Sequence, residues 1–215
     1  MEENRKVFIY KMTTDDGGAP CVRDNLLSLA ICKPAIRSAA GRGDTILGFA
    51  ANSLYRDNCL VYAARVTKNL HGKKYFTQRR YAARPDCIYR WDGTRFEWKA
   101  DARFHQKSDL GHDLGEHPSY GRANVLLSKG RRNFRYFSSD CPLSYKEEYR
   151  LLKTLIENLG QGFRVNFGPK LREEIWCFLL RVWDAPWAYR ETGVPDAPCG
   201  DRCRDQDEDF AAVDC

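Results

Sequence analysis

The spacing of apolar residues changes near residue 140 of this 215-residue chain, and that change most limits its possible folds. Before this point the apolar residues lie in short alternating or β-branched runs, whose period of two is typical of strands. Beyond it they recur every three to four residues, which is typical of amphipathic helices. A segment of strands followed by a segment of helices predicts an α+β domain.

Seven short runs in the first part of the chain are predicted to be strands, at 7–10, 45–49, 60–67, 87–91, 95–99, 125–128 and 133–137. Asp92 and Gly93 form the clearest turn, and they join two aromatic-rich runs into a hairpin. Pro34 suits a first helical position and Gly41 suits a left-handed stop, so a short helix is expected over 34–40. The predicted architecture is a small, twisted or curled mixed sheet, or a barrel, with this helix inserted.

Two helices are predicted to close the domain. Ser144 and Glu147 match the capping box, in which each side chain satisfies a backbone donor at a helix start. The second helix is expected to begin near Pro169 and to end before Pro186. The domain is therefore expected to span residues 1–194, and the segment 195–215 is expected to be a disordered acidic tail.

The charge of the chain is unevenly distributed. The formal net charge is +6, but residues 195–215 hold seven acidic residues and two arginines, a net charge of −5 that leaves +11 on the rest. A positive field of that size favours polyanions, of which phosphate is the most common, although a merely solvated basic surface is the alternative. The expected partner is a nucleic acid or nucleotide, DNA in preference to RNA, and the acidic tail is a candidate docking segment for a protein.

No apolar run is long enough to cross a bilayer and the N-terminus shows no signal-peptide pattern, so we expect a cytoplasmic protein that does not contact a membrane. The cysteines number nine, an odd count in a chain with enough apolar residues for a core, and are expected to be reduced. Those in apolar stretches are interpreted as core residues: Cys32, Cys59, Cys87 and Cys177. Cys199 and Cys203 lack a second pair at zinc-finger spacing, so no metal is expected.

Candidate nucleotide-binding residues are scattered along the chain. Lys33 and Arg37 share a face of the short helix, where they are suited to hold phosphate. Asp44 is either a turn residue or a carboxylate that faces the ligand. Asp86 and Tyr89 flank the start of a strand, where Asp86 either pairs with arginines or contacts a base edge.

Two further segments combine features suited to nucleotides. Gln161 and Arg164 are placed to read a base edge or a phosphate, although a turn between helices explains them nearly as well. Residues 73–104 interleave nine Lys or Arg residues with eight aromatic residues, a pattern that can neutralise phosphate and stack on bases. Because alternate residues of a strand face the core, only about two of these aromatic residues are expected to contact a ligand.

The candidates for proton transfer are His105, His112 and Asp113, which lie in a glycine-containing segment. Imidazole and carboxylate groups there are suited to acid–base catalysis or to metal binding, but their spacing matches no standard metal site. The alternative is a polar surface loop. No nucleophile elbow, dinucleotide fingerprint or phosphate loop is present, so no cofactor is expected and no familiar enzyme class is indicated.

Several motifs occur in a fixed order: FIYK at 8–11, APC at 19–21, LAICKPAIR at 29–37, GDTILGF at 43–49, RPDCIY at 84–89, HDLG at 112–115, ANVLLS at 123–128 and LGQG at 159–162. Through them, residues 7–185 resemble the nucleotide-modification-associated domains of the second type. The resemblance implies an association with systems that make or recognise modified bases in bacterial and phage DNA. A looser likeness, in element order alone, links the chain to barrel domains that bind modified bases or RNA.

The resemblance also implies roles for individual residues. Those that match family motif positions are Lys33, Arg37, Asp44, Asp86, Tyr89, His112, Asp113, Asn124, Gln161 and Arg164. Phe163 departs from the family pattern, which commonly has histidine there. If that histidine is catalytic in the family, this chain is impaired as an enzyme or is purely a binder.

These observations leave three functions open. The leading one is a module that holds a modified base between aromatic rings while Lys33 and Arg37 bind phosphate. The rival is an enzyme that modifies or removes a base or nucleotide through His112 and Asp113, with His105 assisting. The third is a protein-interaction component of a modification or defence system.

Overall fold

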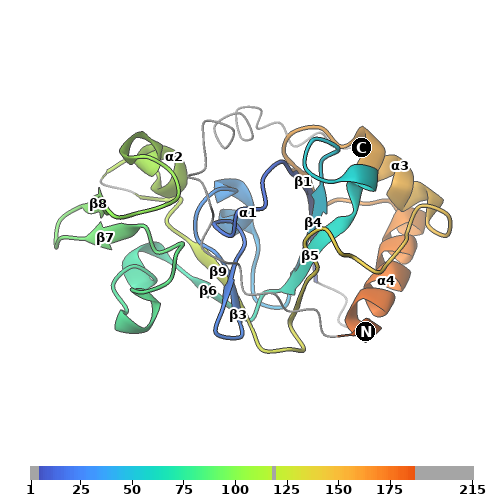
Figure 1. Ribbon diagram of the computed structural model, residues 1–215, viewed down its shortest axis with the longest axis horizontal. Coiled ribbons are helices and arrows are strands. Elements are labelled where there is room, and N and C mark those ends of the chain that lie inside the picture. The colour runs from blue at the N-terminus through green and yellow to red at the C-terminus, as the bar shows by residue number, and fades with distance from the viewer. Residues whose placement is uncertain (1–4, 118–119, 187–215) are drawn as a thin grey trace.

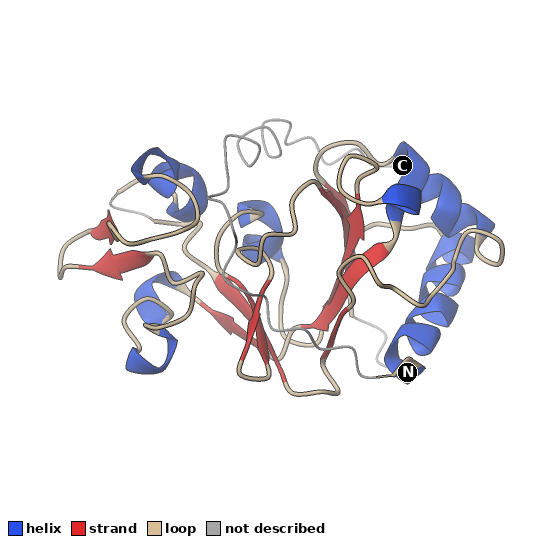
Figure 2. Cartoon of the chain, viewed as in Figure 1, coloured by secondary structure: helices blue, strands red, loops and turns tan. Residues whose placement is uncertain are grey.

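The computed structural model describes residues 5–117 and 120–186, and it confirms an α+β fold (Figures 1 and 2). Its strands are β1 Val7–Met12, β2 Cys21–Arg23, β3 Leu26–Leu29, β4 Thr45–Ala50, β5 Leu60–Arg65, β6 Lys68–Leu70, β7 Tyr89–Trp91, β8 Phe96–Trp98, β9 Val125–Lys129, β10 Phe134–Tyr136 and β11 Phe163–Arg164. Its α-helices are α1 Pro34–Ala39, α2 Leu110–Leu114, α3 Arg150–Asn158 and α4 Pro169–Asp184. Single 3-10 turns lie at Arg56–Asn58, Gly72–Lys74, Arg79–Tyr81 and Lys107–Asp109.

The strands form three sheets. A five-stranded sheet has the order β10-β5-β4-β1-β11, in which β1 and β4 are parallel and the other neighbours are antiparallel. A four-stranded antiparallel sheet has the order β2-β3-β9-β6, and β7 pairs with β8 as the predicted hairpin. Within the described ranges no sheet closes into a barrel, so the barrel form of the prediction is wrong.

The buried apolar residues form three cores, and strand β1 contributes to two of them because its side chains alternate between its two faces. Phe8, Tyr10 and Met12 face a core that also contains residues of β3, β9 and α1, which places this core between the two larger sheets. Val7 and Ile9 face a second core, which α3 and α4 cover from the other side (Figure 1). The side chain of Tyr10 therefore points toward α1 and away from the two C-terminal helices.

A third core lies at the opposite end of the molecule, where β7, β8 and α2 gather (Figure 1). Its fully buried members include Tyr75, Tyr89 and Phe104, from the segment in which basic and aromatic residues interleave. Several of these rings meet edge to face, including those of Phe76 and Phe96. Much of the aromatic content of that segment therefore builds this core.

The start of α3 differs from the prediction. The helix begins at Arg150 and not at the capping-box pattern of Ser144 and Glu147, and no residue at its own start caps it through a side chain. Instead, the Glu174 carboxylate of α4 accepts hydrogen bonds from the backbone N–H groups of Leu151 and Leu152, both at 2.9 Å. A tertiary contact thus supplies the anion that a helix N-terminus favours.

None of the helices in the described part of the chain is both long enough and apolar enough to cross a membrane. The predicted acidic tail and the cysteines at 199 and 203 lie outside the described residues.

Candidate active site

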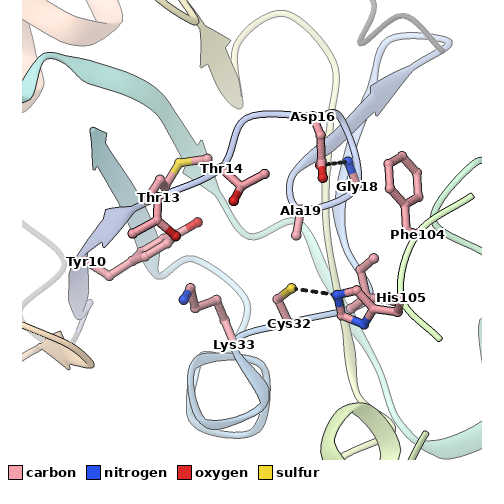
Figure 3. Close-up of a pocket in the computed structure, with 12 residues that line it drawn as sticks. Tyr10, Thr13, Thr14, Asp16, Gly18, Ala19, Cys32, Lys33, Phe104 and His105 are labelled. Carbon is pink, nitrogen blue, oxygen red and sulfur yellow. Dashed lines mark hydrogen bonds between the residues drawn. The ribbon is translucent and has the colours of Figure 1, made fainter. Parts of the chain in front are cut away.

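A small pocket lies where the loop after β1 meets the turn that precedes α1 (Figure 3). Gly18 lets that loop approach the buried ring of Phe104, because a Cβ at position 18 would lie 2.9 Å from the ring. The pocket is small and partly open, with a volume of about 30 Å³. The lining residues are Tyr10, Met12, Thr13, Thr14, Asp16, Gly18, Ala19, Ile31, Cys32, Lys33, Phe104 and His105.

Cys32 presents a thiol to this pocket from the turn between β3 and α1. Its Sγ lies 3.1 Å from Nε2 of His105, a residue 73 positions further along the chain. Cys32 and the next residue, Lys33, both have left-handed backbone conformations, with φ of 55° and 45°. Such conformations cost about 1–2 kcal/mol each for residues other than glycine and are often found at functional sites.

The imidazole of His105 bridges the thiol and a carboxylate. Its Nδ1 lies 2.6 Å from Oδ2 of Asp113, and its side chain is 3% exposed. With the proton on Nδ1 facing the carboxylate, Nε2 is the acceptor for the thiol proton. His105 also has a positive φ, of 54°. The three side chains therefore form an ordered chain from thiol to imidazole to carboxylate.

Asp113, in α2, is fully buried and accepts hydrogen bonds through both oxygens. Oδ2 also accepts the Tyr89 hydroxyl at 2.7 Å, and Oδ1 accepts the backbone N–H of Cys32 at 2.9 Å. Burial by itself raises the pKa of Asp113, but the contact with His105, the charge of Arg37 and the Tyr89 hydroxyl together hold this pKa below its ordinary value. Burial and the Asp113 charge raise the pKa of Tyr89, which keeps its hydroxyl a donor.

This arrangement can activate a nucleophile. A thiol within hydrogen-bond reach of an imidazole, which a carboxylate orients in turn, is the pattern of covalent acyl-transfer catalysis. The carboxylate fixes the tautomer and stabilises the imidazolium that forms when the thiol loses its proton. In the described ranges, no group of three or more His, Cys, Asp or Glu side chains is arranged to hold a metal ion.

The predicted catalytic residues are partly brought together. His105 and Asp113 are in contact, while His112 is half-buried in α2 and is not among the residues that line the pocket. The interpretation of Cys32 as a core residue is wrong, because its half-buried thiol faces the pocket. The sequence around Cys32 is apolar, as it is around the buried Cys87, so it held no signal that separates the two.

The predicted nucleotide-binding residues are spread over several places. Lys33 lines the pocket, with its ammonium 5.3 Å from the centroid of the Tyr10 ring (Figure 3). Arg37 is fully buried and donates to backbone carbonyls. Asp44 is buried and accepts hydrogen bonds from the backbone N–H groups of Lys6 and Gly41, an arrangement that corresponds to its turn alternative.

Asp86 belongs to a buried polar cluster away from the pocket lining. Its carboxylate accepts the hydroxyls of Ser28 and Tyr75 at 2.5 and 2.7 Å, and Nε of Arg84 lies 3.5 Å from it. This is the arginine pairing that the sequence offered as one of two alternatives. Asn124, another of the candidates, has its side-chain Oδ1 at 3.1 Å from Nδ1 of His71.

Gln161 and Arg164 lie near the five-stranded sheet and do not line the pocket. Arg164 pairs with Ile9, and Tyr10 pairs with Phe163, so β11 runs antiparallel to β1. This register brings the loop that contains the exposed Gln161 beside the end of β1, where the pocket loop begins.

Taken together, the fold and this site define an α+β domain with a Cys–His–Asp arrangement, of which Cys32 and His105 line a small pocket. The chain belongs to the family described as nucleotide modification associated domain 2, whose model matches residues 4–158. That range includes Cys32, His105 and Asp113 but ends before Gln161. No match to the chain was found among curated proteins or among solved structures.

Proposed function

We propose that this domain is a thiol-dependent acyltransferase or hydrolase that acts on an acyl or amide group carried by a nucleotide or base. The observation that carries the proposal is the linear order of Cys32 Sγ, His105 and Asp113, with contacts of 3.1 and 2.6 Å, at a pocket. Family membership supports a role in nucleotide modification. Base binding, the leading interpretation of the sequence, becomes the recognition step of this reaction.

In the proposed reaction, Nε2 of His105 removes the proton from the Cys32 thiol as sulfur attacks the carbonyl carbon. The tetrahedral intermediate collapses when the carbon–nitrogen or carbon–oxygen bond breaks, and the leaving group takes the proton from His105. The product is a thioester on Cys32. Water, or an acceptor amine or alcohol, then gives a proton to Nε2 and attacks the thioester, which releases the acyl product and restores the thiol.

Neighbouring groups fit the charges that develop in this reaction. The oxyanion of the tetrahedral intermediate is stabilised by nearby donors, and Thr13 and Thr14, whose hydroxyls can donate, line the same pocket (Figure 3). The pocket volume of about 30 Å³ suits the scissile group alone. The base and phosphate therefore lie at the mouth, where Lys33 is the nearest candidate for a phosphate contact.

The proposal is tested first by the reactivity of Cys32. We expect iodoacetamide to modify Cys32 at pH 7 about tenfold faster than Cys59, because His105 is placed to take the Cys32 proton as sulfur attacks, whereas burial raises the pKa of Cys59. His105→Ala should remove the difference. Equal rates at the two cysteines, read by peptide mass spectrometry, would argue against an activated thiol.

The reaction class is tested by incubating the protein with nucleosides acylated on an exocyclic amine, such as N4-acetylcytidine, and recording the intact mass. An adduct on Cys32 that hydroxylamine removes is a thioester. Cys59→Ala should retain the adduct and Cys32→Ala should lose it. A hydroxylamine-resistant adduct would indicate a thioether and would overturn the acyl-transfer assignment while leaving Cys32 as the nucleophile.

A further inference from the structure

Arg37 makes four hydrogen bonds to backbone carbonyls from a fully buried guanidinium. Nε donates to Cys32 at 2.7 Å, and Nη2 donates to Asp113 at 2.5 Å. Nη1 donates to Arg122 at 2.9 Å and to Asn124 at 2.7 Å. The partners come from the turn before α1, from helix α2 and from the segment that leads into β9, so one side chain joins its own turn to two segments that lie 76 to 87 positions further along the chain.

Two of these four carbonyls belong to residues of the proposed catalytic site. Cys32 is held at its N–H by the Asp113 carboxylate and at its C=O by Arg37, while Arg37 also holds the C=O of Asp113. The three residues therefore form a closed ring of contacts. Such double restraint explains how Cys32 keeps its left-handed backbone conformation, which requires support from its surroundings.

Arg37 also contributes charge. A buried cation is costly unless charge and hydrogen bonds compensate it, and the Arg37 charge is one of the influences that lower the pKa of the buried Asp113. An ionised Asp113 is the form that stabilises a His105 imidazolium. The same guanidinium thus restrains the backbone of the nucleophile and favours the charged form of the carboxylate.

We propose that Arg37 is a positioning residue that sets both the geometry and the charge of the Cys32–His105–Asp113 site. This inference rests on the thiol chemistry proposed above. It replaces the expectation that Arg37 binds phosphate, because its donors point to backbone carbonyls inside the protein.

Two substitutions separate geometry from charge. Arg37→Lys keeps the charge but cannot make the four bonds, whereas Arg37→Met loses both. We expect Arg37→Met to raise the midpoint of the Asp113 carboxyl titration, followed by ¹³C NMR, and Arg37→Lys to leave it near the wild-type midpoint. The iodoacetamide rate at Cys32 should fall about tenfold in Arg37→Met and less in Arg37→Lys.

Arg84 provides a matched control. It too is buried and donates to backbone carbonyls, those of Cys21, Arg23 and Leu26, but it lies beside Asp86 and not beside Asp113. Arg84→Met should therefore lower the melting temperature in the same way as Arg37→Met, while the Asp113 titration and the Cys32 rate stay at wild-type values.

A measurement on the unaltered protein covers the case in which the Arg37 variants do not fold. The side-chain Nε–H signal of Arg37 in ¹⁵N spectra should exchange slowly with water and should shift when Cys32 is alkylated, whereas the Arg84 signal should not shift. An unshifted Arg37 signal, or folded Arg37→Met with an unchanged Asp113 titration, would overturn the inference. The Asp113 titration does not depend on the reactivity of the thiol. An unchanged titration therefore counts against the role of Arg37, whereas slow alkylation of wild-type Cys32 counts against the proposed function.

Discussion

Tyr89 donates its hydroxyl to the same oxygen of Asp113 that His105 contacts, at 2.7 Å and inside the protein. The phenol therefore supports the carboxylate from within the protein, and its raised pKa keeps it a hydrogen-bond donor at neutral pH. The fold thus isolates one end of the proposed site from water while Cys32 and Lys33 face the pocket (Figure 3).

The first prediction concerns this phenol. Tyr89→Phe removes one hydrogen bond to a buried charged group, which typically contributes about 1.5–3 kcal/mol. We expect the free energy of unfolding in urea to fall by roughly 2 kcal/mol and the iodoacetamide rate at Cys32 to fall with it. Tyr81→Phe, in the same aromatic core, is the control and should leave the Cys32 rate unchanged. Equal effects of the two substitutions would show that Tyr89 acts through packing alone.

The second prediction concerns pH. Because the folded pKa of Asp113 lies below its ordinary value of 3.8, the carboxylate contributes stability above the unfolded pKa and loses it as pH falls through the folded pKa. Asp113→Asn should destabilise the protein most at pH 7 and progressively less below about pH 4. Urea unfolding of both proteins from pH 7 to pH 3 measures this convergence, and a constant difference across that range would contradict it.

Much of the fold could be predicted from the sequence, because periodicity and turn residues are local signals. The seven predicted strands, the helix at Pro34 and the helix at Pro169 all correspond to observed elements. The short strands β2, β3, β6 and β11 were not predicted, whereas the equally short β7, β8 and β10 fall within longer predicted runs, because a period can be seen only over several residues. The helix start predicted from the capping-box pattern was wrong, because the group that caps α3 is Glu174, which is distant in sequence.

The site was predicted only in part, for a related reason. His105 and Asp113 stand eight residues apart and were selected together, but Cys32 reaches His105 across 73 positions. An apolar neighbourhood in the sequence is typical of core cysteines, and Cys87 is indeed buried. Only the tertiary fold distinguishes Cys32 from it, since the left-handed turn before α1 directs the Cys32 thiol to the pocket.

The third prediction concerns the loop that forms the opposite wall of the pocket. The Asp15 carboxylate accepts hydroxyls from Tyr55 at 2.9 Å, Ser138 at 2.8 Å and Tyr136 at 2.5 Å. Asp15→Asn cannot accept all three, so we expect a loss of roughly 2 kcal/mol in unfolding free energy and faster amide hydrogen exchange at residues 13–18. Asp140→Asn, an exposed change two residues after Ser138, is the control and should leave the exchange of this loop unchanged. Unchanged exchange in the loop would show that other contacts hold this wall.

The fourth prediction separates the stability of the fold from the integrity of the site. Glu174→Ala removes the carboxylate that caps α3, and loss of a helix cap typically costs about 1 kcal/mol. The two C-terminal helices lie on the face of the five-stranded sheet that is turned away from α1 (Figure 1), so the Cys32 rate should not change. Lys170→Ala, an exposed change in the first turn of α4, is the matched control and should alter neither quantity. A fall in the Cys32 rate with Glu174→Ala would contradict this prediction. It would mean that α3 and α4 are coupled to the pocket through β1, because the two faces of β1 contact the two cores.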